Sequence, residues 1–312
     1  MDDRGGFGRL VCQLDRFPLA SAFRNGVHRV PTAVISDVHG NAVALKAVLA
    51  DIERRGITRI VCLGDTVGYG PDPLESVDLV SSKCAWCLMG NHDYGVLYEP
   101  TNFNPGAESA AFWTRDQFDQ EPDPALRAKR YEFLNRLKVR VVESIGEGGI
   151  SAAGSTAVQL LAVHGSPRRP INEYIFPDDT SNSPDKIDSI FDRVQHVCIV
   201  GHTHVPGVFT SEPDFYPPGE LGDDRCYSFR EGEKAIINVG SVGQPRDFDP
   251  RASYVVIHGP GETSADRPNF KGGSLGFVQF VRVEYDIATT ANKIKAIPQL
   301  SDWLGDRLYE GR

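Results

Sequence analysis

The sequence lacks several features that would assign it to a specialised class of protein. Only 6 of its 312 residues are cysteine, too few for a disulfide scaffold in a chain of this length. It has no run of about 18 apolar residues that could cross a membrane, and no apolar core of a signal peptide near the N-terminus. These absences predict a cytoplasmic protein with no membrane partner.

Basic residues are also in short supply. The chain has 33 Lys and Arg against 42 Asp and Glu, which gives a net charge of −9. Nonspecific binding of nucleic acid requires clustered Lys and Arg, so we do not expect extended DNA or RNA as a partner. A small anionic substrate remains compatible with this charge if metal ions supply the missing positive charge.

Periodicity predicts alternating strands and helices, the arrangement of an α/β protein with mostly parallel strand pairing. Successive strands later in the chain suggest a second, more antiparallel sheet. The expected helices cover residues 41–56, 73–82, 107–118 and 124–137. The expected strands cover residues 32–37, 59–65, 85–93, 159–165, 196–202, 235–241, 253–259 and 277–285, with long loops at 211–234 and 259–275.

Five of these strands end in residues that can bind a metal ion. In open α/β sheets, ligands gather at the carboxyl ends of the strands, so we expect these side chains to converge. These side chains are more numerous than the four ligands of a tetrahedral metal site. Two metal ions that share one carboxylate would use them all. Oxygen and imidazole ligands without thiolate favour manganese, iron, zinc or nickel. The candidate ligands are Asp37, His39, Asp65, Asn91, His164, His202 and His204.

Other residues of the same types have ordinary interpretations. Any single Asp after a strand is usually a turn residue or a helix N-cap. We interpret His28, His196 and His258 as unrelated to the site, because they do not follow apolar runs in this way. Cys84 and Cys87 have the spacing of a redox or zinc motif, but no second pair accompanies them, so we expect two cysteines on a strand.

Five ordered blocks, "DVHGN", "GDTVGYGP", "GNHDYG", "HGSP" and "GHTHVP", resemble the signature of the calcineurin-like metallophosphoesterases. The later block "NVGSVGQPRD" is similar to the bacterial small-phosphodiesterase or diadenosine-polyphosphatase-like branch, and the resemblance covers residues 32–247. It implies a four-layer αββα sandwich of two mixed sheets with helices outside. We therefore expect an N-terminal extension at 1–29 and a single domain at 30–312, with a helical insert at about 106–138.

The resemblance also implies roles for individual residues. Asp37, His39 and His204 would hold one metal, Asn91, His164 and His202 the other, and Asp65 would bridge them. His92 would protonate the leaving oxygen or stabilise charge in the transition state, with Asp93 orienting its ring.

The candidate substrate contacts have equally simple structural interpretations. Asn41 would act through the helix N-terminus or only as an N-cap, and Arg246 would clamp a phosphate or pair with Asp247 or Asp249. Tyr69 and Tyr174 would stack on a nucleobase or only pack.

These expectations favour a phosphoesterase that uses a metal-bridging hydroxide to attack a small phosphodiester, phosphoanhydride or phosphomonoester, nucleotides included. A serine/threonine phosphoprotein phosphatase with the same metal site is the alternative. A nuclease for long DNA conflicts with the negative charge. A non-catalytic scaffold of the same fold is least favoured, because every expected ligand and His92 are present.

Overall fold

The computed structural model describes residues 31–146, 149–152, 158–264 and 275–312. The expected extension at 1–29 therefore lies outside the described residues. Most of the expected loop at 259–275 also lies outside them.

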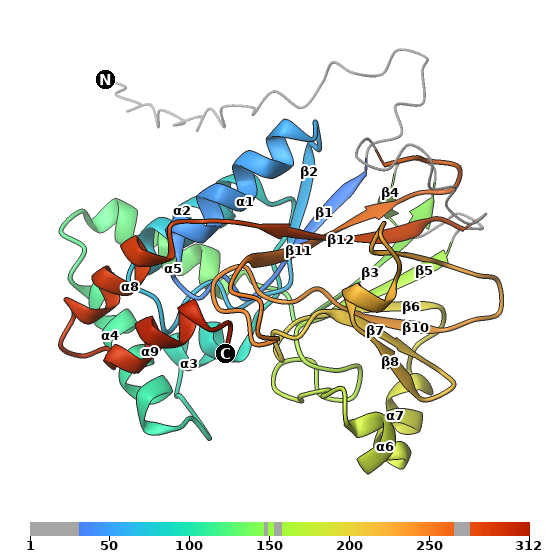
Figure 1. Ribbon diagram of the computed structural model, residues 1–312. Helices are drawn as coiled ribbons and strands as arrows, with labels where there is room; N and C mark the ends of the chain where they lie inside the picture. The colour runs from blue at the N-terminus through green and yellow to red at the C-terminus, as the bar shows by residue number, and fades with distance from the viewer. Residues whose placement is uncertain (1–30, 147–148, 153–157, 265–274) are drawn as a thin grey trace, which may run out of the picture.

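Two mixed β-sheets form the centre of the molecule (Figure 1). Among the described residues, the first sheet has the strand order β2-β1-β11-β12-β9 and the second β4-β3-β5-β6-β10-β7-β8. In the first, β1 runs parallel to β2 and antiparallel to β11. In the second, β6 runs parallel to β5 and β10. The strands of the first sheet are β1 (Thr32–Ile35), β2 (Arg59–Cys62), β9 (Cys226–Ser228), β11 (Ala252–His258) and β12 (Phe277–Val283). Those of the second are β3 (Arg140–Gly146), β4 (Gly149–Ala152), β5 (Val158–Val163), β6 (Val197–Val200), β7 (Gly207–Thr210), β8 (Asp214–Tyr216) and β10 (Ala235–Asn238).

The central strands are buried on both faces, which explains why they appear in the sequence as unbroken apolar runs. Val34 of β1 points into the core between the sheets, whereas its neighbours Ala33 and Ile35 point toward the helices outside. In the second sheet, Ile199 of β6 lies in the same inter-sheet core and Cys198 on the outer side. This alternation follows from the period of two along a strand.

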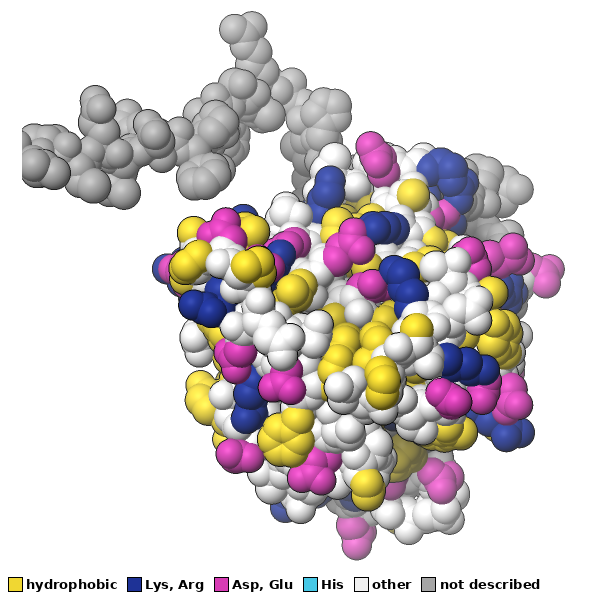
Figure 2. All heavy atoms as spheres, turned by 90° about the vertical axis from the view of Figure 1, so that its left-hand side faces the viewer, with side chains coloured by type: hydrophobic (Ala, Val, Ile, Leu, Met, Phe, Trp, Pro, Cys, Tyr) yellow, Lys and Arg dark blue, Asp and Glu magenta, His cyan; other side chains and the backbone are white. Residues whose placement is uncertain are grey.

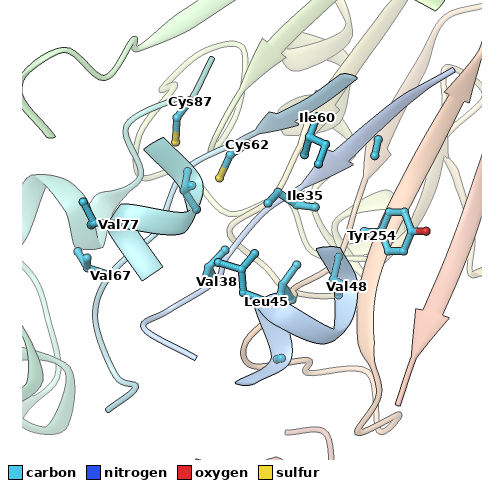
Figure 3. Close-up of a cluster of buried hydrophobic side chains, with 14 of the residues drawn as sticks. Ile35, Val38, Leu45, Val48, Ile60, Cys62, Val67, Val77, Cys87 and Tyr254 are labelled. Atoms are coloured by element: carbon cyan, nitrogen blue, oxygen red, sulfur yellow. The ribbon is translucent and has the colours of Figure 1, made fainter. Parts of the chain in front are cut away.

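Helices cover the outer face of each sheet. Leu45 and Val48 of α1, Val77 of α2 and Tyr254 of β11 belong to the core under the first sheet (Figure 3). Ile187 of α7 belongs to the core under the second. The layers are therefore helix, sheet, sheet and helix, which confirms the expected αββα sandwich. The outer helices of the first sheet are α1 (Ala42–Arg54), α2 (Pro73–Lys83), α4 (Pro105–Asp119) and α5 (Pro124–Asn135); those of the second are α6 (Asp179–Asn182) and α7 (Pro184–Phe191).

Several segments differ from the expectation, and strands β3, β4 and β7 were not expected at all. The expected strand at 85–93 is not formed: residues 85–90 make only isolated bridges from Cys87 and Leu88, and helix α3 (Asn91–Leu97) begins inside the expected strand. The expected loop 211–234 contains β8, the 3₁₀ helix η1 (Pro218–Glu220) and β9. These strands are three residues each, too short to produce a clear pattern. Cys84 and Cys87 are free thiols, and burial raises the pKa of both.

A C-terminal segment packs beside the insert helices. It consists of α8 (Ile287–Lys295), α9 (Asp302–Asp306) and the 3₁₀ helix η2 (Arg307–Tyr309). Leu304 and Leu308 pack with Trp113 of α4, and Tyr69 lies against this cluster. On this face of the molecule, acidic and basic side chains are interspersed with apolar ones (Figure 2). No helix in the described part of the chain is long and apolar enough to cross a membrane.

Candidate metal centre

The seven candidate ligands come together at one edge of the sandwich. The loops after β1 and β2 supply Asp37, His39 and Asp65, and the loops after β5 and β6 supply His164, His202 and His204. Asn91 is the first residue of α3. The Asp and His side chains are almost entirely buried, with at most 3% of any of them exposed. Burial of this many ionisable groups requires partners that compensate for lost water.

One cluster consists of Asp37, His39 and His204, whose ligand atoms all lie within 4.8 Å of one another. His204 Nε2 lies 3.1 Å from Asp37 Oδ1. His39 Nε2 lies 3.0 Å from His204 Nε2. This convergence of two imidazole nitrogens and a carboxylate oxygen is the arrangement that a transition metal binds.

A second cluster contains Asp65, His164 and His202, again with ligand atoms within 4.8 Å of one another. His164 Nε2 lies 3.3 Å from Asp65 Oδ2. The same Asp65 oxygen lies 3.6 Å from His39 Nε2 of the first cluster, so this carboxylate stands between the two. Asn91 Oδ1 and His202 Nε2 are buried without a hydrogen-bond partner among the described residues. Such orphaned acceptors fit a cation as their missing partner.

Backbone carbonyls determine which imidazole nitrogen faces the centre. His39 Nδ1 lies 3.2 Å from the carbonyl oxygen of Val67, and His164 Nδ1 lies 3.0 Å from that of Leu63. A carbonyl accepts only, so each Nδ1 carries the proton and donates it. In the neutral rings, Nε2 then presents a lone pair to the centre, as in metal-binding histidines.

The electrostatics of the centre are compatible with a bound cation. Burial lowers the pKa of His39 and His204, so these rings are neutral near neutral pH. Burial acts in the same direction on His164, but the charges of Asp65 and Asp37 outweigh it and raise the pKa of His164 to about 10. The two buried carboxylates thus hold a proton on His164, a positive charge that a metal ion would replace.

The ligand-bearing backbone is left-handed at five positions. The φ angles are 54° at Asp37, 50° at His39, 51° at Asp65, 67° at His202 and 62° at His204. Non-glycine residues rarely adopt this region, and it clusters at functional sites. No periodicity in the sequence predicts it.

This backbone also explains how His202 and His204 reach different clusters. In an extended segment, residues two apart point the same way. Here the ring of His202 lies 5.0 Å from that of His164, whereas the ring of His204 lies 4.8 Å from that of His39. The turned chain therefore delivers one imidazole to each cluster.

His92 lies beside the two clusters. Its ring centroid is 4.8 Å from that of His39, and its Nδ1 has no hydrogen-bond partner in the described part of the chain. Burial lowers the pKa of His92 to about 4. Asp93 was expected to orient this ring, but its carboxylate accepts hydrogen bonds from the backbone N–H groups of Asp65 (2.8 Å) and Gly90 (3.0 Å) instead. Asp93 therefore joins two ligand-bearing loops.

The expected substrate residues differ in their surroundings. Asn41 caps α1, since its Oδ1 accepts from Ala44 N at 3.1 Å. Its Nδ2 donates to the carbonyl of Gly243 at 2.9 Å, so the simple N-cap interpretation accounts for this side chain. Tyr174 stacks on His202 with ring centroids 3.8 Å apart.

Arg246 does not form the expected alternative ion pairs. Asp247 pairs with Arg282, and Asp249 pairs with Arg251. The guanidinium of Arg246 instead donates to Gln244 Oε1 at 2.7 Å. It lies over the ring of Tyr69, 5.8 Å from the centroid. No carboxylate in the described part of the chain pairs with this guanidinium, so it could bind an anion near the candidate ligands.

A cavity of about 210 Å³ opens beside His92 and His202. Its walls come from the loop before α4, from α3 and from the segment that carries Tyr174, and they combine aromatic rings with side-chain amides. Tyr69 and Tyr174, two candidate substrate contacts from the sequence, line this cavity. Phe103, Asn104 and Asn172 also line it, and no sequence pattern pointed to them.

Residues 31–260 match the calcineurin-like phosphoesterase superfamily domain. The chain belongs to this superfamily. An uncharacterized protein of Methanocaldococcus jannaschii is 36% identical over 283 residues, which cover 90% of this chain and 98% of that protein. A metallophosphoesterase from Sphaerobacter thermophilus is 33% identical, with a TM-score of 0.67 and coverage of 91% of this chain and 99% of that chain.

A hypothetical protein from Pyrococcus horikoshii shares the fold at 20% identity, with a TM-score of 0.60 and coverage of 91% of this chain and 99% of that chain. Members of the superfamily typically bind a dimetal centre, and the Asp and His clusters described above are able to hold metal. Family and fold together support a hydrolase of phosphoesters.

Proposed function

We propose that this protein hydrolyses a small phosphodiester, phosphoanhydride or phosphomonoester at a centre of two metal ions. The observation that carries this proposal is the pair of buried clusters, in which Asp65 of the second lies 3.6 Å from His39 of the first. Asn91 Oδ1 and His202 Nε2 also have no hydrogen-bond partner among the described residues. Two separate groups of ligands joined by one carboxylate are what a two-metal site needs.

Asp37, His39 and His204 would hold one ion, and Asn91, His164 and His202 would hold the other, with Asp65 contacting both. Manganese, iron, zinc and nickel fit these oxygen and imidazole donors. When bound, such ions make water acidic enough to serve as a nucleophile near neutral pH and neutralise the phosphoryl oxygens.

His92 acts on the leaving oxygen in this proposal. Its ring lines the cavity, and its free Nδ1 has no competing partner among the described residues. The burial that lowers its pKa leaves the imidazole neutral and able to donate a hydrogen bond. The negative charge of a bound phosphoryl group raises this pKa, so the ring can then carry the proton that the leaving oxygen takes.

The cavity favours small substrates over a phosphoprotein. Its volume of about 210 Å³ is smaller than that of most ligand pockets. The loop before α4 and Tyr174 form part of its wall. A nucleotide is one substrate that the aromatic rings and amides would suit. A serine/threonine phosphoprotein phosphatase remains the alternative within the same chemistry.

We also propose that residues 30–312 form one cytoplasmic domain with α4 and α5 as a helical insert, of which Ala107 of α4 lines the cavity. Limited proteolysis tests the domain proposal: a stable fragment that retains both sheets and α4 supports it, whereas independent release of α4 and α5 would contradict it.

The decisive experiment combines metal analysis with an assay on bis(p-nitrophenyl) phosphate. We expect two transition-metal ions per chain and metal-dependent cleavage. His92→Ala should retain the metals and lose activity by about 100-fold or more, the usual contribution of a general acid. His196→Ala is the matched control, because its ring accepts a hydrogen bond from Gln159 N far from the centre.

Full activity after chelation would refute the metal mechanism. Diadenosine polyphosphates, cyclic nucleotides and phosphopeptides, assayed with the same enzyme, separate the substrate classes. A marked preference for phosphopeptides would favour the phosphoprotein phosphatase instead, and metal binding without any hydrolysis would favour the non-catalytic scaffold.

A further inference from the structure

The ring of His202 is held differently from the rings of the other three candidate histidine ligands. Nδ1 of His39, His164 and His204 lies between 2.6 and 3.2 Å from a backbone carbonyl oxygen. The ring of His202 has no hydrogen bond to any residue that the structure describes. A hydrogen bond to the second ring nitrogen usually orients a metal-binding imidazole, so the orientation of His202 depends on another contact.

Tyr174 supplies that contact. The centroids of the Tyr174 and His202 rings are 3.8 Å apart, and the two planes are inclined by only 19°. The ring of His164 is 5.0 Å from that of His202 and is inclined by 58°, so it does not stack. A flat ring that covers one face of the imidazole resists rotation of the imidazole out of its plane. The stack therefore does for His202 what a carbonyl does for the other three rings.

A second ring supports Tyr174. Phe176 stacks on it with centroids 5.1 Å apart and planes inclined by 9°. His202, Tyr174 and Phe176 thus form a series of three nearly parallel rings. Because two rings already stack on Tyr174, little of its ring face is left for a nucleobase. This arrangement favours the packing interpretation of Tyr174 over the substrate interpretation.

The loop after β5 turns back on itself and fixes the position of Tyr174. A Cβ atom at Gly165 would lie 2.8 Å from the backbone nitrogen of Glu173, so only glycine allows these two parts of the loop to approach so closely. The side chain of Glu173 accepts a hydrogen bond from Arg168 Nε at 3.1 Å and another from the hydroxyl of Ser166. The residue before Tyr174 is therefore tied to the start of its own loop.

We propose that Tyr174 is a positioning residue that holds the imidazole of His202 in place as a metal ligand. This inference rests on the proposed function, in which His202 and His164 bind the same ion. An imidazole bound to a cation carries part of the positive charge, and the face of an aromatic ring attracts positive charge. The stack is therefore stronger when the site is loaded, so Tyr174 raises the affinity of this site for its metal.

The test measures binding of Co²⁺, a transition metal that suits oxygen and imidazole ligands and whose visible spectrum depends on the number and geometry of its ligands. The metal-free protein is titrated in competition with a chromophoric chelator. In Tyr174→Ala we expect the Kd of one of two Co²⁺ ions to rise about tenfold or more, as for the loss of other groups that orient a ligand. The Kd of the other ion should change less than about threefold, and the visible spectrum of the weakened site should change as well.

Two variants control for other effects. Tyr174→Phe keeps the ring and should bind both ions within about threefold of the wild-type Kd values. Phe112→Ala removes a ring of similar exposure, 41% against 38% for Tyr174, and should leave both Kd values unchanged. If thermal melting shows that metal-free Tyr174→Ala is misfolded, Tyr174→Leu decides the question. Leucine fills the space without a flat ring, so the same ion should be weakened.

Unchanged affinity for both ions in Tyr174→Ala, or equal weakening of both, would overturn the proposal. A Tyr174→Phe variant as weak as Tyr174→Ala would also overturn it, because the hydroxyl rather than the ring would then be responsible. The proposed function fails separately if wild-type protein binds two ions but does not cleave bis(p-nitrophenyl) phosphate; the role of Tyr174 would still stand. Wild-type protein that binds no Co²⁺ would refute both.

Discussion

At the scale of single residues, Gly90 is as important for the candidate site as the ligands, because its lack of a side chain leaves room for Asp65. A Cβ atom at Gly90 would lie 2.0 Å from Asp65 Oδ1 and 2.5 Å from the backbone nitrogen of Asp65. The same carboxylate oxygen accepts a hydrogen bond from the backbone N–H of His92 at 2.8 Å. Asp65 therefore cannot remain where it is if position 90 gains a methyl group.

Gly90→Ala should displace the shared carboxylate. We expect at least one metal ion to be lost from each chain and activity on bis(p-nitrophenyl) phosphate to fall by about 100-fold, because misplacement by about 1 Å has that effect. Elemental analysis of the purified protein measures the metal. Gly219→Ala is the control, because nothing lies within 4 Å of the added Cβ. Unchanged metal content in Gly90→Ala would show that a Cβ atom at position 90 does not displace the Asp65 carboxylate.

The residue types of the site were predictable, but their local conformations were not. Chain order places Asp37, Asp65, His164 and His202 after buried strands, and the ends of parallel strands meet. The partners of Asp93 could not be predicted, because its bonds to the backbone of Asp65 and Gly90 depend on how two loops meet in space.

At the scale of elements, one buried hydrogen bond ties helix α1 to strand β11. The hydroxyl of Tyr254 donates to Asp51 Oδ2 at 2.6 Å, and Arg55 Nε donates to the same oxygen at 2.6 Å. Burial alone would raise the pKa of Asp51, but these hydrogen bonds outweigh it and lower the pKa. The link therefore stabilises the fold while Asp51 is ionised.

Tyr254→Phe should lower the free energy of unfolding by about 1.5 to 3 kcal/mol at pH 7, the contribution of a hydrogen bond to a charged group. A lowered pKa gives stability that is complete above the unfolded pKa and is lost as pH falls through the folded pKa. The difference between wild type and variant should therefore shrink below about pH 4. Urea unfolding at several pH values measures it.

Tyr131→Phe is the matched control, because its hydroxyl donates to Asp119 Oδ1 at 2.7 Å in an exposed pair. It should cost less than about 1 kcal/mol. A Tyr254→Phe effect that does not depend on pH would mean that Asp51 is not the partner that matters.

Elements with a clear apolar pattern were predictable even where they are short, as for β1 and β6, whereas β3, α7 and α8 were not expected although they are longer. Strand β11 and helix α1 have strong apolar patterns, because the sheet and the helix face that they form are buried. Strands β8 and β9 lie at sheet edges and are only partly buried. Tertiary contact rather than local sequence decides whether such segments pair.

At the scale of the whole molecule, the candidate metal centre spans both sheets. Asp37 and Asp65 follow strands of the first sheet, whereas His164 and His202 follow strands of the second. Ions bound to both sets would hold the sheets together at this edge. The sandwich expected from the sequence brings strand ends of both sheets to one edge. The sequence could not predict how deeply the side chains at this edge are buried.

Removal of the metals should therefore lower the melting temperature. A ligand present at about 1,000 times its Kd contributes about 4 kcal/mol, so we expect chelation to lower Tm by on the order of 5 to 10 °C. Differential scanning calorimetry with and without chelator measures this shift. Asp65→Asn should show a smaller shift, because a neutral amide bridges two cations poorly. An identical Tm after complete metal loss would show that the centre does not join the sheets.

The left-handed ligands have a consequence for how this protein can diverge. Each of the five costs on the order of 1 kcal/mol relative to an ordinary backbone conformation. Glycine adopts the same φ of 54° at Asp37 or 67° at His202 without that penalty. Conformational energy at these positions therefore favours the loss of the ligands. If these residues bind metal as proposed, selection for that function would keep them, and a descendant without that selection could lose the ligands and keep the fold.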